Sequence, residues 1–140
     1  MAVSTMTEMW KILQAYTYDA AGNERPVNQN NEWGGFSRRL NMPVFTGWSD
    51  RVKYDKETKT TTGVVSDTTS TKLIGLNNQE RWLSHAEKHN DGIAAFFVIH
   101  AVDTNADPRK IESIDDGRVF VGKIIRDGTK TRIIGKATPL

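Results

Sequence analysis

Two histidines in this sequence have a spacing that suits metal binding. His85 and His89 are four residues apart, so on a helix both imidazoles lie on one face. A zinc-protease motif needs a glutamate directly after the first histidine, but Ala86 occupies that position. The spacing of the remaining histidine and of the carboxylates demands no third ligand. We therefore expect two surface histidines without a metal ion. Metal binding by this pair is the alternative that the sequence leaves open.

A Glu-x-Lys triplet at residues 57–59 is a second pattern with possible chemistry. In metal-dependent nucleases such a triplet lies on a buried strand and holds Mg²⁺ and the attacking water, with an aspartate earlier in the chain. Asp50 and Asp55 precede Glu57, but the triplet lies in the most polar stretch of the chain. Carboxylates with a fixed, buried geometry are not expected there. A solvent-exposed turn is the favoured interpretation.

The chain lacks the residue sets that most enzymes need. It has no cysteine, which excludes a disulfide framework, thiolate metal ligands and a cysteine nucleophile. It shows no combination of nucleophile, base and orienting group. We expect a non-catalytic protein without a cofactor. A small enzyme that uses His85, His89 or His100, and a small-ligand-binding barrel, are the less favoured alternatives.

Aromatic and basic residues alternate between positions 33 and 53, and the last 25 residues add further cations. This mixture is typical of nucleic-acid-binding surfaces, because cations neutralise phosphates, arginine hydrogen-bonds to guanine, and rings stack on unpaired bases. Trp33 and Trp48 could equally pack in the core, and the register across the last turn decides whether its cations share a face. The predicted nucleic-acid-binding residues are Trp33, Arg38, Arg39, Trp48, Arg51, Lys53, Arg126, Lys130 and Arg132.

A protein-interaction or accessory role is the main alternative to nucleic-acid binding. The threonine-rich segment around residues 58–71 suggests an exposed hairpin of two strands, residues 60–66 and 68–74, and a flexible loop is the other interpretation. Such a hairpin could add a strand to a protein partner or to a second copy of the chain. Trp33 and Trp48 would then be anchors of the interface.

Length and charge set the general class of the protein. The 140 residues fit a single domain, and 19 basic against 17 acidic residues give a net charge of +2, which is too small to identify a partner. The basic excess lies in residues 31–75 and 107–140. No apolar run approaches the roughly 18 residues of a membrane span, and the N-terminus lacks the features of a signal peptide. We expect a soluble, cytoplasmic protein without membrane contact.

Hydrophobic periodicity and turn residues divide the first half of the chain. A helix is expected over about residues 5–18, with Thr5 or Thr7 as its cap, because apolar residues recur there at helical spacing. A polar loop is expected over residues 19–35. Strands rich in aromatic and β-branched residues are expected over about residues 43–75.

A second helix and a set of strands are expected in the other half. Asn77, with Glu80 three residues later, predicts the cap of a helix over about residues 78–89. The sequence Asn-Asp-Gly at residues 90–92 predicts its end. Strands follow over about residues 93–136.

Within the last segment, three stretches carry the strand prediction. The continuous apolar run over residues 93–102 indicates a buried strand. Two alternating stretches, residues 118–125 and 131–136, flank a turn that contains Asp127 and Gly128 and predict a hairpin. The order of the elements favours an α+β fold, with a mixed, mainly antiparallel sheet curled toward a partial barrel and two helices packed on it.

Overall fold

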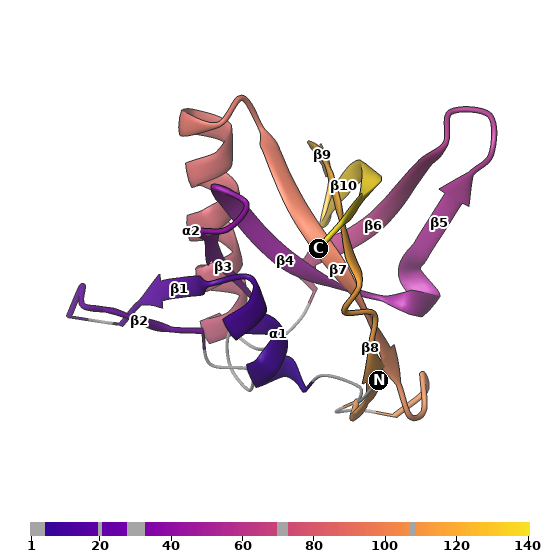
Figure 1. Ribbon diagram of the computed structural model, residues 1–140. Helices are drawn as coiled ribbons and strands as arrows, with labels where there is room; N and C mark the ends of the chain where they lie inside the picture. The colour runs from indigo at the N-terminus through magenta and orange to yellow at the C-terminus, as the bar shows by residue number, and fades with distance from the viewer. Residues whose placement is uncertain (1–4, 20, 28–32, 70–72, 107–108) are drawn as a thin grey trace.

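The computed structural model describes residues 5–19, 21–27, 33–69, 73–106 and 109–140, which form mostly sheet with two α-helices (Figure 1). Neither helix in this part of the chain is long and apolar enough to cross a membrane. In chain order the elements are α1 (Met6–Ile12), β1 (Ala15–Tyr18), β2 (Glu24–Pro26), β3 (Gly34–Ser37), β4 (Met42–Trp48), the 3-10 turn η1 (Ser49–Arg51), β5 (Val52–Asp55), β6 (Thr60–Asp67), α2 (Leu73–His89), β7 (Ile93–Ala101), β8 (Ile111–Ile114), β9 (Arg118–Asp127) and β10 (Lys130–Pro139).

The strands form one mixed sheet in the order β2-β1-β3-β4-β7-β9-β10-β6-β5, with β8 paired to β7. Among the described strands only the β4–β7 pair is parallel, so the predicted mainly antiparallel α+β fold is confirmed. β6 returns toward β4, as shown by Gly63 of β6 and Gly47 of β4, which both lie against the ring of Phe96. In the part of the chain that the structure describes, however, the hydrogen-bonded ladder does not close, and the expected partial barrel is not confirmed.

Both faces of the central strands are covered. Phe97 of β7 packs beneath α1 with Met9, whereas its neighbour Phe96 lies on the other face with Trp82 and Leu83 of α2. Alternate residues of a strand point to opposite faces, so a strand covered on both sides must be apolar throughout. This explains the continuous apolar run at residues 93–102, and the predicted buried strand is confirmed as β7.

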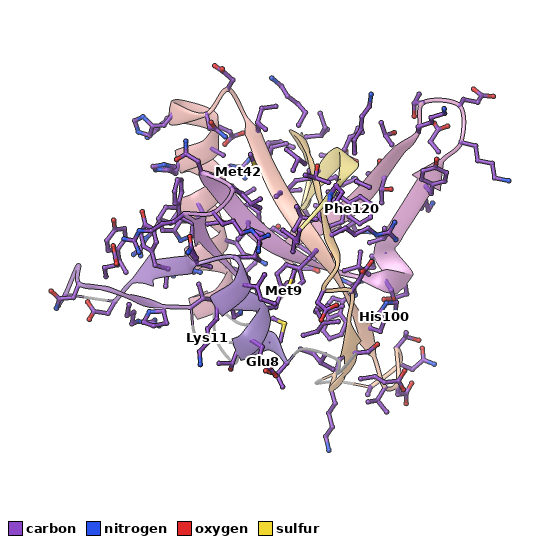
Figure 2. All side chains as sticks on the ribbon, in the orientation of Figure 1. Glu8, Met9, Lys11, Met42, His100 and Phe120 are labelled. Atoms are coloured by element: carbon purple, nitrogen blue, oxygen red, sulfur yellow. The ribbon has the colours of Figure 1, made fainter. Side chains whose placement is uncertain are left out.

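The first helix starts as predicted but ends early. Thr5 caps it in a capping box with Glu8, and Figure 2 shows Met9 directed toward the sheet, with Glu8 and Lys11 on the opposite side of the helix. The helix ends at Ile12 because Gln14 adopts a left-handed conformation (φ 53°). The predicted helical residues 15–18 instead form β1, which pairs with β2 and β3.

The expected polar loop over residues 19–35 is partly wrong. The Asp19 carboxylate accepts hydrogen bonds from the backbone N–H groups of Ala21 and Asn23, which turns the chain back into β2. The first residues of β3, Gly34 and Gly35, also fall in this segment and pair with β4. Residues 28–32 lie outside the described part of the chain.

The predicted threonine-rich hairpin is also wrong. Residues 60–67 do form a strand, β6, but its partners are β5 and β10 rather than residues 68–74. Asp67 accepts hydrogen bonds from the backbone N–H and the hydroxyl of Thr69, and α2 begins at Leu73. Asn77 therefore lies inside the helix and does not cap it. Residues 70–72 are outside the described part.

The remaining predictions for the second half are confirmed. The helix α2 ends at His89, and Asp91 and Gly92 follow with left-handed φ angles of 55° and 73°. The final hairpin is formed by β9 and β10, which pair from Arg118 to Pro139 around a turn in which Gly128 has a φ of 61°.

Candidate nucleic-acid interface

The structure separates the predicted nucleic-acid-binding residues into several environments. Arg38, at the end of β3, forms an ion pair with Glu24, and its guanidinium lies 4.2 Å from the centre of the Tyr16 ring. Arg39 is exposed and directs Nη1 toward the Ile12 carbonyl oxygen at 3.4 Å. Arg38 thus has a structural role that joins β3 to β1 and β2.

The two tryptophans of the predicted surface are half-buried packing residues. A methyl group added to Gly75 of α2 would lie 2.6 Å from the Trp33 ring, so Trp33 packs closely against this helix. Trp48 packs against the cluster beneath α1, and the Arg109 guanidinium lies 5.1 Å from its ring centre. Arg109 is held there by two hydrogen bonds to Asp50, of 2.7 and 2.8 Å. Both half-buried rings are therefore engaged in packing within the fold, which limits their use for base stacking.

Arg126 is neutralised by two carboxylates of α2. Its Nη1 and Nη2 atoms donate to both oxygens of Glu80 at 2.8 and 2.9 Å, and its Nη2 and Nε atoms donate to Glu87 at 2.7 and 3.2 Å. These bonds hold the pKa of Arg126 above its ordinary value, and the hydrogen bonds from Arg126 lower the pKa of Glu80. Arg126 therefore clamps β9 to α2 and is not available to a phosphate.

Strand pairing places the other cations of the hairpin on one surface. In β10, Lys130, Arg132 and Lys136 alternate with the buried residues Thr131 and Ile133, so they point away from α2. Residues that pair across neighbouring strands face the same side. We call the outward side of β5, β6, β10 and β9 the outer sheet face; its members include Lys53, Thr62, Val64, Lys123, Ile125, Lys130, Arg132, Ile134 and Lys136.

One row of this face crosses all four strands. Lys53 pairs with Thr62, Thr62 with Ile134, and Ile134 with Lys123. Since neighbouring strands are about 4.8 Å apart, Lys53 and Lys123 are separated by roughly 14 Å along the row. Ile125 and Ile134 are each 40% exposed, so neither helix covers this face.

The carboxylates of the outer sheet face lie at the strand ends and are engaged locally. Asp55 accepts a hydrogen bond of 2.9 Å from the backbone of Glu57, and Asp127 pairs with Arg132. Asp67 is bonded to Thr69, and these bonds, together with the charge of Lys130, lower its pKa. The middle of the face therefore carries cations and aliphatic groups, whereas its acids form the rim.

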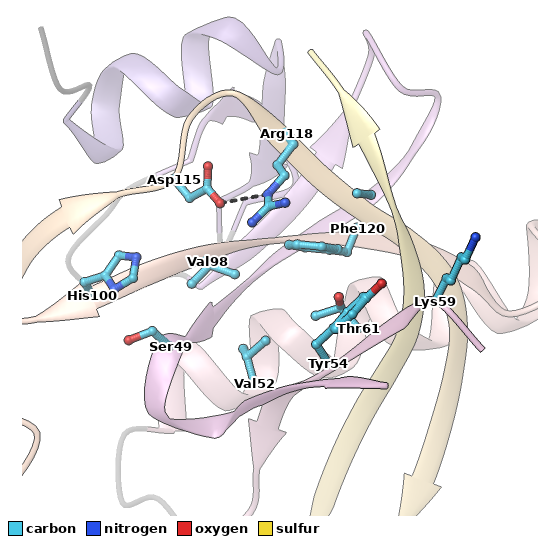
Figure 3. A pocket seen from close by; sticks show the side chains of 11 residues that line it. Ser49, Val52, Tyr54, Lys59, Thr61, Val98, His100, Asp115, Arg118 and Phe120 are labelled. Atoms are coloured by element: carbon cyan, nitrogen blue, oxygen red, sulfur yellow. Dashed lines mark hydrogen bonds and ion pairs between the residues drawn. The ribbon is translucent and has the colours of Figure 1, made fainter. Parts of the chain in front are cut away.

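A groove of about 600 Å³ lies on the opposite, concave side of the same strands. Figure 3 shows Val52 and Tyr54 on one wall, Phe120 and Arg118 on the other, and Lys59 and His100 toward its two ends. No sequence motif brings these residues together, since they come from β5, the β5–β6 turn, β7 and β9. The sequence signal for this groove is the alternation of side chains along β9, which places the even-numbered Arg118 and Phe120 on the opposite face of the strand from Lys123.

The other candidate sites remain without a visible ligand set. His85 and His89 lie with ring centres 4.9 Å apart on α2, and burial, followed by the charge of His89, lowers the pKa of His85. Within the described residues, no group of three or more histidine, aspartate or glutamate side chains is arranged to hold a metal ion. Residues 57–59 form the predicted exposed turn between β5 and β6.

Comparisons of the chain with protein-family models, with curated proteins and with solved structures found no match. The outer sheet face and the groove are therefore the features from which a function is inferred.

Proposed function

We propose that this protein is a non-catalytic nucleic-acid-binding protein and that the outer sheet face is its contact surface. The carrying observation is the set of cations on an uncovered face of four strands. Lys53, Lys130 and Lys136 are joined there by Lys123, whose Nζ also donates to the Asp91 carbonyl oxygen at 2.8 Å, and by Arg132, which is paired with Asp127. Three of the predicted residues, Lys53, Lys130 and Arg132, belong to this set. The others of that prediction are engaged elsewhere or lie beside the face.

Physical chemistry favours a phosphate backbone as the occupant. Phosphates are spaced regularly along a strand, and their neutralisation by lysine and arginine releases counterions, which supplies most of the affinity of sequence-independent binding. Cations spaced across an uncovered sheet face match this pattern. Among the described residues of this face none is aromatic, so the proposed contacts position the backbone and do not select a sequence.

The test is fluorescence anisotropy with labelled single- and double-stranded DNA and RNA at low and at physiological salt. We expect saturable binding that weakens steeply with salt. The double variant Lys53→Ala/Lys136→Ala should weaken binding at least tenfold at low salt. The dependence of log K on log salt should also become shallower, by about 0.7–0.9 for each phosphate that the variant no longer neutralises.

Lys11→Ala is the matched control, because Lys11 is an exposed cation on α1, outside the outer sheet face. It should leave the affinity unchanged. The proposal fails if none of the four nucleic acids binds at low salt, or if the control weakens binding as much as the double variant does.

A second candidate function is supported by the two exposed isoleucines of this face, Ile125 and Ile134. An acidic protein partner could cover them while pairing with the surrounding lysines. In that case the nucleic-acid titrations would be negative, and Ile134→Ser would weaken association with the partner at constant salt.

A further inference from the structure

The concave groove combines apolar walls with an accessible aromatic ring. Val52 and Phe120 contribute apolar surface to its two walls, and Phe120 is held by stacking on Phe96, with ring centres 5.2 Å apart. Tyr54 lines the groove with 62% of its surface exposed. Such an exposed ring can stack on a planar ligand.

Cations lie beside this aromatic surface. Arg118 is fixed on two sides, because its Nε donates to Asp115 at 3.0 Å and its guanidinium lies 5.0 Å from the centre of the Phe120 ring. Among the described residues, nothing else is hydrogen-bonded to its two Nη atoms, which can therefore donate to an anion. Lys59, in the turn after Tyr54, adds a second cation.

The acidic group of the groove does not cancel this positive charge. Asp115 is the carboxylate among the described lining residues, and its charge is offset by the ion pair with Arg118. Lys59 then leaves a positive excess. The volume of about 600 Å³ falls in the range of about 300–1,000 Å³ that is typical of pockets for small molecules.

We propose that this groove binds a small aromatic anion of the nucleoside monophosphate class. The planar ring packs against Tyr54 and Val52, and the phosphate accepts hydrogen bonds from the Arg118 guanidinium, with Lys59 adding positive charge at one end of the groove. This inference does not depend on the proposed function, because the groove and the outer sheet face are on opposite sides of the same strands. The ligand is either a free nucleotide or one nucleotide of a strand, and both offer the same ring and phosphate.

The experiment is calorimetric titration of the full chain with the 5′-monophosphates of adenosine, guanosine, cytidine and uridine, and with adenosine and inorganic phosphate as separate probes. At least one monophosphate should bind saturably and more tightly than adenosine or phosphate alone. Tyr54→Ala and Arg118→Gln should each weaken that binding by about tenfold, since one removes the stacking ring and the other the guanidinium.

Lys56→Ala is the matched control, because Lys56 lies in the same exposed turn but does not line the groove. It should leave the affinity unchanged, and thermal unfolding should show that all three variants are folded. The inference is overturned if no monophosphate binds, if inorganic phosphate binds as tightly as the nucleotides, or if both groove variants bind like the unmodified protein.

Variants of the two surfaces separate the inference from the proposed function. Lys53→Ala/Lys136→Ala should retain monophosphate binding, whatever its effect on oligonucleotides. If Tyr54→Ala also weakens binding of a single-stranded oligonucleotide, the groove holds a nucleotide of the strand. If it leaves oligonucleotide binding intact, the groove holds a free nucleotide. Monophosphate binding without oligonucleotide binding would contradict the proposed function and support the inference that the groove binds a nucleotide.

Discussion

A buried chain of hydrogen bonds at Thr17 joins the second helix to the sheet. The Thr17 hydroxyl accepts from Nε1 of Trp82 at 3.0 Å and donates to Oδ1 of Asn78 at 2.7 Å. The Nδ2 atom of Asn78 then donates to the carbonyl oxygen of Gly34 at 2.7 Å. Because all these groups are buried, each bond satisfies a polar atom that has no access to bulk water.

Replacing Thr17 by valine should be strongly destabilising although the two side chains have nearly the same shape. The variant leaves Nε1 of Trp82 and Oδ1 of Asn78 buried without this partner, which should lower the free energy of unfolding by about 3 kcal/mol. Urea unfolding monitored by circular dichroism measures this change. Thr62→Val, at a half-exposed position of β6, should change the free energy of unfolding by less than about 0.5 kcal/mol. Equal effects of the two substitutions would contradict the role of the hydroxyl.

At the scale of elements, the ion-pair cluster of Arg126 links the turn end of β9 to α2. Glu80 and Glu87 are two turns apart on the helix, so both carboxylates face the same guanidinium. The side chains are 39% exposed for Arg126 and 58% exposed for Glu80, and solvent therefore screens much of their attraction. The cluster contributes to how the helix is oriented on the sheet more than to total stability.

This cluster predicts a dependence of stability on pH. The pKa of Glu80 is lowered from 4.5 in the folded state, so its contribution is fully present above the unfolded value and is lost as pH falls through the lower folded value. We expect Glu80→Gln to lower the free energy of unfolding by about 1 kcal/mol or less at neutral pH, after allowance for solvent screening. The difference between the variant and the original protein should shrink as the pH falls below 4.5 and through the lower folded-state pKa of Glu80. Denaturant titrations at neutral pH and at a series of pH values below 4.5 test this. A constant difference between the variant and the original protein would exclude the proposed linkage.

At the scale of the whole molecule, uneven coverage of the sheet creates both proposed binding surfaces. The central strands lie between α1 on one face and α2 on the other. β10, β6 and β5 continue beyond α1, which leaves the outer sheet face uncovered (Figure 1). The return of β6 toward β4 makes the opposite side concave, where the groove lies.

The same coverage predicts the pattern of local stability. Amide protons of β7 should exchange most slowly, because Phe96 and Phe97 are fully buried and the strand pairs on both sides. Those of the edge strands β5 and β2 should exchange by local opening at much higher rates. Hydrogen exchange followed by NMR measures this order. Protection in β5 that equals protection in β7 would show that the edge is covered by an additional contact, such as a second copy.

Local signals were sufficient for several elements. The apolar run of β7, the Asp-Gly turn between β9 and β10, and the capping box of Thr5 each depend on residues close together in the chain. The end of α2 at His89 is similarly local, because it depends on the left-handed Asp91 and Gly92 that follow it. Such features act over a few residues, and the sequence alone therefore determined them.

Tertiary contacts decided the rest. Residues 15–18 continue the helical pattern of residues 6–12, but pairing with β2 and β3 makes them a strand. The cations of the last hairpin look equivalent in sequence, yet the structure directs Arg126 to α2, Arg118 to the groove and Arg132 to the outer sheet face. These outcomes depend on strand register and on partners tens of residues away. Hydrophobic periodicity carries no information about such distant pairings, which is why the composition of the chain was visible in the sequence and the location of its charges was not.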